Sequence, residues 1–279
     1  RCYRARVAQV RLVKKLSTWR KVALVAWDAP RDPTAYGTLD LDCENALAYL
    51  AEIEARTGER VTLTHLTGKA IAMAIAENPE TNAFASRGRL MLRETVDVFF
   101  QVVFDEGSNL AGAKVSRADE KSVIEIGQEL RSRATAIRTK SDAETARGAR
   151  SLAALPSWFV GFATRAGANL SYDWNLDLSR FGIPHDAFGS VMVTNVGTFG
   201  ISVGYAPLLE LSRVPLIMTL GAVRDAPSVH EGALCIRKRV TIGVAFDHRV
   251  LDGYQAGMLA RTFIRAFEDP KGALGDPMT

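Results

Sequence analysis

The sequence has few of the side chains that enzymes use for covalent, redox or metal chemistry. Among its 279 residues there are only three cysteines and four histidines. Cys2, Cys43 and Cys235 are widely spaced and odd in number, a pattern that excludes both a disulfide framework and the spacing of a metal site. We therefore expect a protein of a reducing compartment, the cytoplasm, in which the cysteines serve as small hydrophobic side chains.

Long apolar runs and a strong charge bias are missing too. No run reaches the roughly 18 apolar residues of a membrane-spanning helix, and the basic start lacks the apolar stretch of a secretory signal. The net charge is +4, and basic residues are scattered apart from a cluster within residues 1–20. We expect neither a membrane nor a nucleic acid as a partner. The sequence also contains no phosphate-binding P-loop and no Rossmann glycine fingerprint.

Hydrophobic periodicity predicts helices at separated positions among several strands. Strands are predicted at 38–41, 96–104, 190–194, 216–220 and 240–246. Helices are predicted from an N-cap at Asp42 to Gly58, around 66–75, over 121–140 and over 253–267. This order favours one α+β domain in which helices cover a mixed β-sheet.

The strand predicted at 240–246 has two unlike faces. Large residues alternate with small ones along it, since Val240, Ile242, Val244 and Phe246 are separated by Thr241, Gly243 and Ala245. The large residues suit a core. The small face has room for another stretch of backbone or for a ligand.

The residues after this strand form the first candidate site. His248 is followed four positions later by Asp252 and Gly253, at a predicted strand-to-helix corner. A histidine held there can take a proton from a thiol or hydroxyl near neutral pH, and Asp252 can cap the helix or pair with an arginine. The motif alone fits a core histidine beside an N-capping aspartate equally well.

A second candidate site is the end of the strand predicted at 190–194. Thr194, Asn195 and Gly197 place a hydroxyl, an amide and a glycine at that end. A hydroxyl in this place can donate a hydrogen bond to an oxyanion that develops on a carbonyl. In isolation, a strand end followed by a glycine turn explains the same residues.

Several motifs together, in order, resemble one family. The D-H-R-V-L-D-G stretch at 247–253 resembles the signature of the acyltransferase core of 2-oxo acid dehydrogenase complexes, whose superfamily includes chloramphenicol acetyltransferase. The T-N-V-G stretch at 194–197 resembles that family's strand ending in a hydroxyl residue, a polar residue and glycine. N-P-E-T-N-A at 78–83, D-E-K-S at 119–122 and the proline-led strand at 215–217 also resemble family motifs. The similarity runs from about residue 18 onward.

The resemblance implies a single domain over 18–279 with a chloramphenicol acetyltransferase-like fold, preceded by a basic N-terminal extension at 1–17. It also implies that His248 is the base that deprotonates the thiol of CoA or of a dihydrolipoyl arm, with Thr194 as the oxyanion donor. Asp252 would be a structural partner paired with an N-terminal arginine, for which Arg20 is the candidate. Gly253 and Asn195 would give structural support. The family forms its active sites between the subunits of a homotrimer.

Three departures from the family limit what the resemblance implies. No lipoyl or peripheral-subunit-binding domain occurs in the sequence, so we expect a lipoyl group supplied in trans by a lipoyl-domain or dehydrogenase protein. An insertion around 145–188 is rich in aromatic residues and would wall an acyl pocket, plug the lipoyl entrance or extend an interface; extra packing is the simpler alternative. The small residues at 270–279 predict a flexible tail, which favours a trimer over a large cage.

Three functions remain open from the sequence. CoA-dependent acyl transfer to a dihydrolipoyl or similar thiol fits best; the alternatives are an acetyltransferase acting on a small hydroxyl or amine compound, and a non-catalytic trimeric scaffold. CoA would be a substrate, and the residues that bind it are not identifiable. We expect no metal, because His65, His185 and His230 lack carboxylate or cysteine partners at metal spacing.

Overall fold

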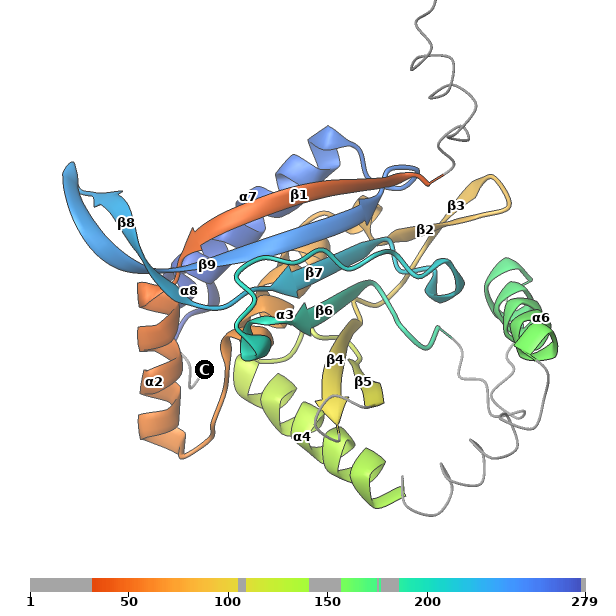
Figure 1. The fold of residues 1–279 in the computed structure, drawn as a ribbon, viewed down its shortest axis with the longest axis horizontal. Helices are drawn as coiled ribbons and strands as arrows, with labels where there is room; N and C mark the ends of the chain where they lie inside the picture. Colours follow the sequence, from red (N-terminus) through yellow and green to blue (C-terminus); the bar gives the residue numbers. More distant parts are fainter. Residues whose placement is uncertain (1–31, 105–108, 141–156, 175, 177–185, 277–279) are drawn as a thin grey trace, which may run out of the picture. The chain divides into compact units, whose positions relative to one another are not determined.

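A mixed β-sheet forms the centre of the fold. The computed structural model describes residues 32–104, 109–140, 157–174, 176 and 186–276. The sheet has seven strands, six of them in the order β1-β9-β7-β6-β4-β5, with β8 paired to β9 (Figure 1). Strand β6 runs parallel to β4 and β7, and the other pairs are antiparallel. The strands are β1 (Thr34–Asp42), β4 (Val98–Phe104), β5 (Asn109–Val115), β6 (Val191–Asn195), β7 (Leu216–Leu220), β8 (Arg224–His230) and β9 (Ala233–Asp247).

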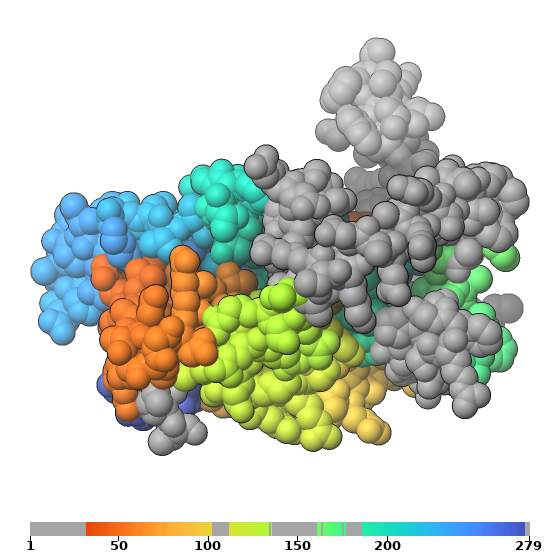
Figure 2. All heavy atoms as spheres, turned by 90° about the horizontal axis from the view of Figure 1, so that it is seen from below, coloured from red at the N-terminus to blue at the C-terminus, as the bar shows by residue number. Residues whose placement is uncertain are grey.

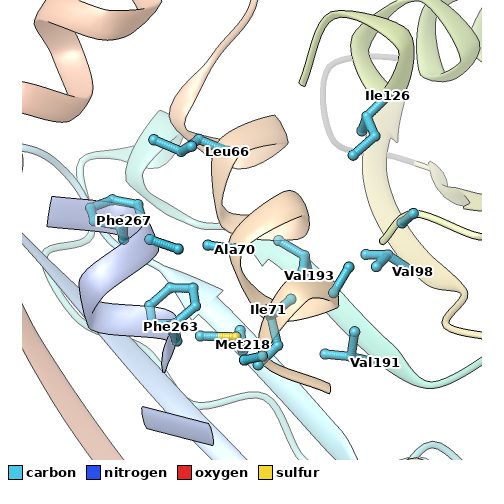
Figure 3. Close-up of a cluster of buried hydrophobic side chains, with 14 of the residues drawn as sticks. Leu66, Ala70, Ile71, Val98, Ile126, Val191, Val193, Met218, Phe263 and Phe267 are labelled. Carbon is cyan, nitrogen blue, oxygen red and sulfur yellow. The ribbon is translucent and has the colours of Figure 1, made fainter. Parts of the chain in front are cut away.

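Four helices cover one face of this sheet, because each has one apolar side. They are α2 (Glu44–Thr57), α3 (Leu63–Glu77), α4 (Val123–Lys140) and α7 (Gly253–Glu268). Their buried residues join those of the strands in one core cluster. Figure 3 shows side chains of α3 between those of α7 and those of β6, with Met218 of β7 beside Phe263. The predicted α+β class and the mixed sheet covered by helices are thus confirmed.

Helix α3 lies unusually close to the sheet. Several of its buried positions are small, namely Gly68, Ala70, Ala72 and Ala74, as the alanine-rich sequence predicts. A Cβ atom added at Gly68 would lie 2.2 Å from the Phe100 ring of β4, so only glycine fits between the helix and this side chain. The helix stops at Asn78, whose amide donates a hydrogen bond to the Ala74 carbonyl (2.8 Å).

The predicted N-cap of the first helix is wrong by one residue. Asp42 is the last residue of β1, and Cys43 occupies the N-cap position of α2. The Asp42 carboxylate accepts a hydrogen bond from the Glu44 amide, but it is also engaged by the Arg237 guanidinium from β9. This tertiary contact extends the strand by one residue. The helix ends as predicted at Gly58, which adopts a left-handed conformation (φ 72°).

Helix α4 is joined to the end of α2 by polar contacts. Arg131 of α4 forms an ion pair with Glu59 and donates a hydrogen bond to the Arg60 carbonyl (2.6 Å), just after α2. In Figure 2 the two segments lie next to each other on the same face. Within the described residues, no helix is both long enough and apolar enough to cross a membrane.

The opposite face of the sheet is covered by backbone rather than by helices. A Cβ atom at Gly243 of β9 would lie 1.9 Å from the Gly204 carbonyl oxygen, and one at Gly221 would lie 2.0 Å from that of Ser202. The chain around 202–204 therefore crosses the small-residue face directly. This confirms the room predicted from the alternation of β9.

Several elements were not predicted. The hairpin of β2 (Ala83–Ser86) and β3 (Arg89–Leu92) follows a short helix η1 (Pro79–Thr81), and α6 (Ser157–Ala168) with η4 (Asn169–Asp173) lies in the insertion. Two further single turns are η6 (Gly197–Phe199) and η7 (Glu210–Ser212). The tail predicted to be flexible contains α8 (Pro270–Leu274), because the Asp269 carboxylate caps it through the Gly272 amide (3.1 Å) and Pro270 is buried.

His65 is a structural residue of helix α3. Its Nδ1 accepts a hydrogen bond from the Thr62 amide (3.2 Å), which completes a capping box at the start of the helix. The ring is buried, and Gly127 of α4 packs against it. Burial, together with the positive charge of Arg131, lowers the pKa of His65 to about 4. The imidazole is therefore neutral in the folded protein above pH 4.

This pKa predicts a pH-dependent loss of stability. The unfolded chain binds a proton at His65 below about pH 6.5, whereas the folded chain does not until about pH 4. Stability is therefore lost as the pH falls from 6.5 to 4, by about 2–3 kcal/mol in total. His65→Gln should keep the capping box and flatten this dependence in urea unfolding at pH 7 and 4.5. His230→Gln, which changes an exposed histidine, is the control; equal slopes in wild type and His65→Gln would contradict the prediction.

Candidate active site

The corner after β9 is held by Asp247. This buried residue receives backbone hydrogen bonds at its carbonyl from Val250 and Leu251, both at 2.9 Å, and its own amide donates to the Pro215 carbonyl (2.9 Å). Its carboxylate accepts from the Arg249 amide (2.9 Å) and forms an ion pair with the Arg249 guanidinium (2.8 Å). The loop after β9 is therefore held through both the backbone and the carboxylate of Asp247.

His248 projects from this fixed corner into solvent. Its side chain is exposed, and its ring lies beside that of Phe246, with 6.2 Å between the ring centres. Phe246 itself packs against the core, so it holds one side of the imidazole while the nitrogens stay accessible. An exposed imidazole on a rigid backbone suits proton exchange with a bound substrate. The structure thus excludes the alternative of a buried core histidine.

Asp252 caps the helix that follows. Its carboxylate accepts hydrogen bonds from the amides of Tyr254 (2.8 Å) and Gln255 (3.1 Å), and the Gln255 side chain accepts from the Asp252 amide (2.8 Å). This is a complete capping box at the start of α7. Arg20, the candidate ion-pair partner, lies outside the described residues. A Cβ atom at Gly253 would meet nothing within 4 Å, so packing in this chain does not require the glycine there.

Thr194 lies near the end of β6 and faces away from the helices. Val191 and Val193 belong to the helix-side core, whereas Met192 belongs to a smaller apolar cluster on the other face. Because side chains alternate along a strand, the half-buried Thr194 shares the face of Met192. Asn195 points back to the helix side, where its amide donates to the Thr64 hydroxyl (3.0 Å) at the start of α3.

The turn after Thr194 is fixed by a glycine. The Asn195 side chain accepts a hydrogen bond from the Gly197 amide (2.9 Å). A Cβ atom at Gly197 would lie 2.4 Å from the Gly221 carbonyl oxygen, so no other residue fits without moving the backbone. Asn195 and Gly197 therefore hold the end of β6 in place.

Thr219 is a polar residue near this site that the sequence analysis missed. It pairs in register with Thr194 on the same face, and its buried hydroxyl has no hydrogen-bond partner among the described residues. The only signal in the sequence is one threonine within the apolar strand β7. Two neighbouring hydroxyl groups thus lie at this point of the sheet.

One chain does not bring His248 and Thr194 together. Thr194 is in register with Thr219 of β7 and with Gly243 of β9, five residues before His248. Strand β7 also separates β6 from β9. Standard strand rise and spacing place the two residues roughly 19 Å apart. A proton acceptor and an oxyanion donor at this separation cannot serve the same reacting bond within a single subunit.

The other cysteines and histidines in the described part of the chain do not form a second catalytic or metal site. The Cys43 thiol is buried and donates to the Lys238 carbonyl (3.2 Å), and burial raises its pKa to about 11, so it is no nucleophile at neutral pH. His230 is exposed, whereas Cys2 and His185 lie outside the described residues. In the described part of the chain, no group of three or more histidine, cysteine or carboxylate residues is arranged to hold a metal ion.

Known proteins resemble this chain over most of its length. The dihydrolipoyllysine-residue acetyltransferase component of the acetoin cleaving system of Bacillus subtilis is 26% identical over 218 residues, which are 78% of this chain and 44% of that protein. The dihydrolipoyllysine-residue succinyltransferase component of the 2-oxoglutarate dehydrogenase complex of Saccharomyces cerevisiae is 23% identical over 243 residues, 86% of this chain and 43% of that protein. The chain thus spans less than half the length of these relatives.

Solved structures show the same fold. A probable dihydrolipoamide acetyltransferase from Listeria monocytogenes has a TM-score of 0.61 at 17% identity, covering 94% of this chain and 96% of that one. The cubic core of a pyruvate dehydrogenase multienzyme complex has a TM-score of 0.61 at 19% identity, covering 88% and 85%. The family model described as 2-oxoacid dehydrogenases acyltransferase (catalytic domain) matches residues 16–148 and 185–275. Since these two ranges include most of the sequence, the chain belongs to this acyltransferase family.

Proposed function

We propose that this domain is a CoA-dependent acyltransferase that moves an acyl group between CoA and a dihydrolipoyl thiol. The observation that carries the proposal is the exposed imidazole of His248 on the fixed corner after β9, within a chain of this family. The names of the relatives support the lipoyl thiol as the second substrate. The lipoyl group would come from a separate domain or protein.

The proposed reaction is a direct transfer. His248 takes the proton of the attacking thiol, and the thiolate adds to the carbonyl carbon of the acyl thioester. The carbonyl oxygen gains negative charge in the tetrahedral intermediate, and the Thr194 hydroxyl donates a hydrogen bond to it. When the intermediate collapses, the carbon–sulfur bond to the leaving thiolate breaks, and the protonated His248 returns its proton to that sulfur. Asp252 takes no part in the proton transfer; it holds the helix that begins beside His248.

The proposed active site lies between two subunits of a homotrimer. The separation of roughly 19 Å within one chain supports this, because the two groups must act on the same carbonyl. His248 of one subunit would then act with Thr194 of the next.

A pair of strands with an exposed apolar face is a second support for a trimer. Strand β8 and residues 233–239 of β9 form this pair, here called the apolar ribbon, which projects past the other strands (Figure 1) and reaches one end of the view in Figure 2. Val229 and Leu234 are directly opposed, as are Pro227 and Ile236, so these side chains share one face. Val229, Leu234 and Ile236 are 73%, 78% and 77% exposed. An apolar face of this kind suits contact with another copy of the chain.

Replacing the proposed base should remove most of the activity. We expect His248→Ala to lower the rate of acyl transfer from acetyl-CoA to a free lipoyl domain by about 10²–10⁴-fold, the usual contribution of a positioned base. His230→Ala is the matched control and should retain the wild-type rate. The same assay with a panel of hydroxyl and amine compounds tests the alternative acceptor class. A His248→Ala rate close to wild type would disprove the mechanism.

Subunit mixing tests whether the site is shared. Thr194→Ala should lower the rate by about 10²–10³-fold, and Thr194→Ser should restore most of it. A randomly reassembled equal mixture of His248→Ala and Thr194→Ala subunits should recover about one quarter of the wild-type sites, because an intact histidine then meets an intact threonine across some interfaces. Each variant refolded alone is the control. If the mixture stays as inactive as its parts, both groups act within one chain.

The apolar ribbon predicts a variant that fails to assemble. Leu234→Lys combined with Ile236→Lys places two charges where each apolar side chain would otherwise contribute about 1.5–3 kcal/mol on burial. We expect light scattering to show monomers in place of trimers, together with loss of acyl transfer. Glu231→Lys changes the charge at the turn of the ribbon without touching the apolar pairs, and it should remain trimeric. A trimeric double variant would rule out this contact.

A further inference from the structure

A polar cavity lies beside the hairpin β2–β3, away from the proposed site of acyl transfer. Its volume is about 470 Å³. It is lined by residues of the hairpin, by the segment between the hairpin and β4, by Lys114 of β5, by η4 and by Asp186. The residues that the binding argument uses are Phe84, Arg93, Lys114, Ser171, Tyr172 and Asp186.

The insertion supplies part of this cavity. Ser171 and Tyr172 belong to η4, which lies in the range 149–184 that the family model leaves unmatched. The hairpin, β4 and β5 lie in the matched part of the chain. The cavity therefore combines the part of the chain that the family model matches with a segment that it does not match.

Two buried donors in the cavity lack acceptors. Ser171 is 3% exposed, and its hydroxyl has no hydrogen-bond partner among the described residues. The Arg93 side chain is 5% exposed; its Nε and Nη2 donate to Asp186 (2.8 and 3.2 Å), but within the same part of the chain Nη1 has no partner. Burial raises the pKa of Tyr172, and the charge of the nearby Asp186 carboxylate raises it further, yet the buried Tyr172 hydroxyl has no hydrogen-bond partner among the described residues. Buried donors of this kind need acceptor atoms, and a ligand can bring them.

Two cations and three carboxylates line this cavity: Arg93 and Lys114 are paired with Asp186 and Asp97, and the third carboxylate, Glu94, is exposed. Burial by itself would raise the pKa of Asp186, but the hydrogen bond from Arg93 and the charges of Arg93 and Lys114 bring it below its ordinary value. Lys114 also pairs with Asp97 (2.9 Å) and donates to the Asp186 carbonyl (2.7 Å). Asp97 and Asp186 are therefore occupied by these cations, while Arg93 keeps the two N–H bonds of Nη1 to offer. The free hydrogen-bonding capacity favours an acceptor with negative charge.

The cavity also has an apolar wall. The Phe84 ring lies edge-on to Tyr172, with 5.6 Å between ring centres, and the Arg93 guanidinium lies over its face at 4.6 Å. Met91 and Leu92 extend this wall to the exposed rim. A ligand that meets both parts has a charged acceptor at one end and an apolar body at the other.

We propose that this cavity binds a small monocarboxylate with an apolar body. The carboxylate accepts hydrogen bonds from Arg93 Nη1 and the Ser171 hydroxyl, with the Tyr172 hydroxyl beside them, and the apolar body lies against Phe84 and the rim. The site is separate from His248, because β7 and β6 separate β9 from β4 and three strand spacings amount to about 14 Å. It is also apart from Thr194, because Lys114 of β5 lies two strand spacings from β6, about 10 Å. Binding there does not depend on the proposed activity.

Calorimetry with 4-phenylbutyrate tests the proposal, with the neutral 4-phenylbutyramide as the matched ligand. A ligand of this size should bind with a dissociation constant of about 0.1–1 mM. Ser171→Ala should weaken binding about 10-fold or more, which is the usual effect of losing a hydrogen bond to a charged group. It should unfold no more easily than wild type, because the lost hydroxyl has no partner in the described chain. Tyr172→Phe is a second variant: it keeps the ring, removes the hydroxyl beside the carboxylate, and should also weaken binding.

The controls separate this site from the other proposal. Tyr49→Phe changes a buried tyrosine of α2 outside the cavity and should leave binding unchanged. His248→Ala should bind 4-phenylbutyrate as the wild type does, whether or not it transfers acyl groups. The proposal is overturned if 4-phenylbutyrate gives no saturable binding up to about 10 mM, ten times the weakest expected constant. Equal binding of the amide, or full binding by a folded Ser171→Ala, also overturns it.

Discussion

Along residues 240–246 of β9, every second residue is large and faces the helices, whereas the residues between them are small and face a crossing stretch of backbone. This alternation sets both layers of the fold. Val240 and Ile242 pack with α2, α3 and α7, and Gly243 lets the chain near Gly204 lie directly on the sheet. The same strand carries the apolar ribbon at one end and His248 after the other, so its register fixes where both features lie.

The sequence predicted the elements that bury a regular apolar pattern. Helices α2, α3, α4 and α7 and strands β6, β7 and β9 were found from their periodicity. Strand β8 was missed because Arg224–His230 is half-polar and largely exposed, and hairpin β2–β3 because its strands have four residues each. The predicted N-cap at Asp42 was wrong for another reason. The contact with Arg237, almost two hundred residues later, keeps Asp42 in strand β1. No local pattern contains that contact.

The sequence predicted the local motifs of the candidate site, but it could not predict how far apart they lie in the fold. The corner of His248 is formed by neighbours in sequence, since Asp247, Arg249 and Asp252 act within a few residues of it. Its distance from Thr194 depends on strand order, because β7 lies between β9 and β6. The cavity beside η4 needs residues from positions 84 to 186, and the sequence gives no spacing that would connect them.

The close approach of backbone to the sheet has an evolutionary consequence. At Gly197, Gly221 and Gly243 an added methyl group would meet backbone at 2.4 Å or less. Neighbouring rotamers cannot relieve such overlaps, so every substitution at these three positions must move the backbone. Positions such as Ser171 and Tyr172 carry no such restriction, because they border a cavity. Sequence drift can therefore change what the cavity recognises while the surface beside Thr194 keeps its shape.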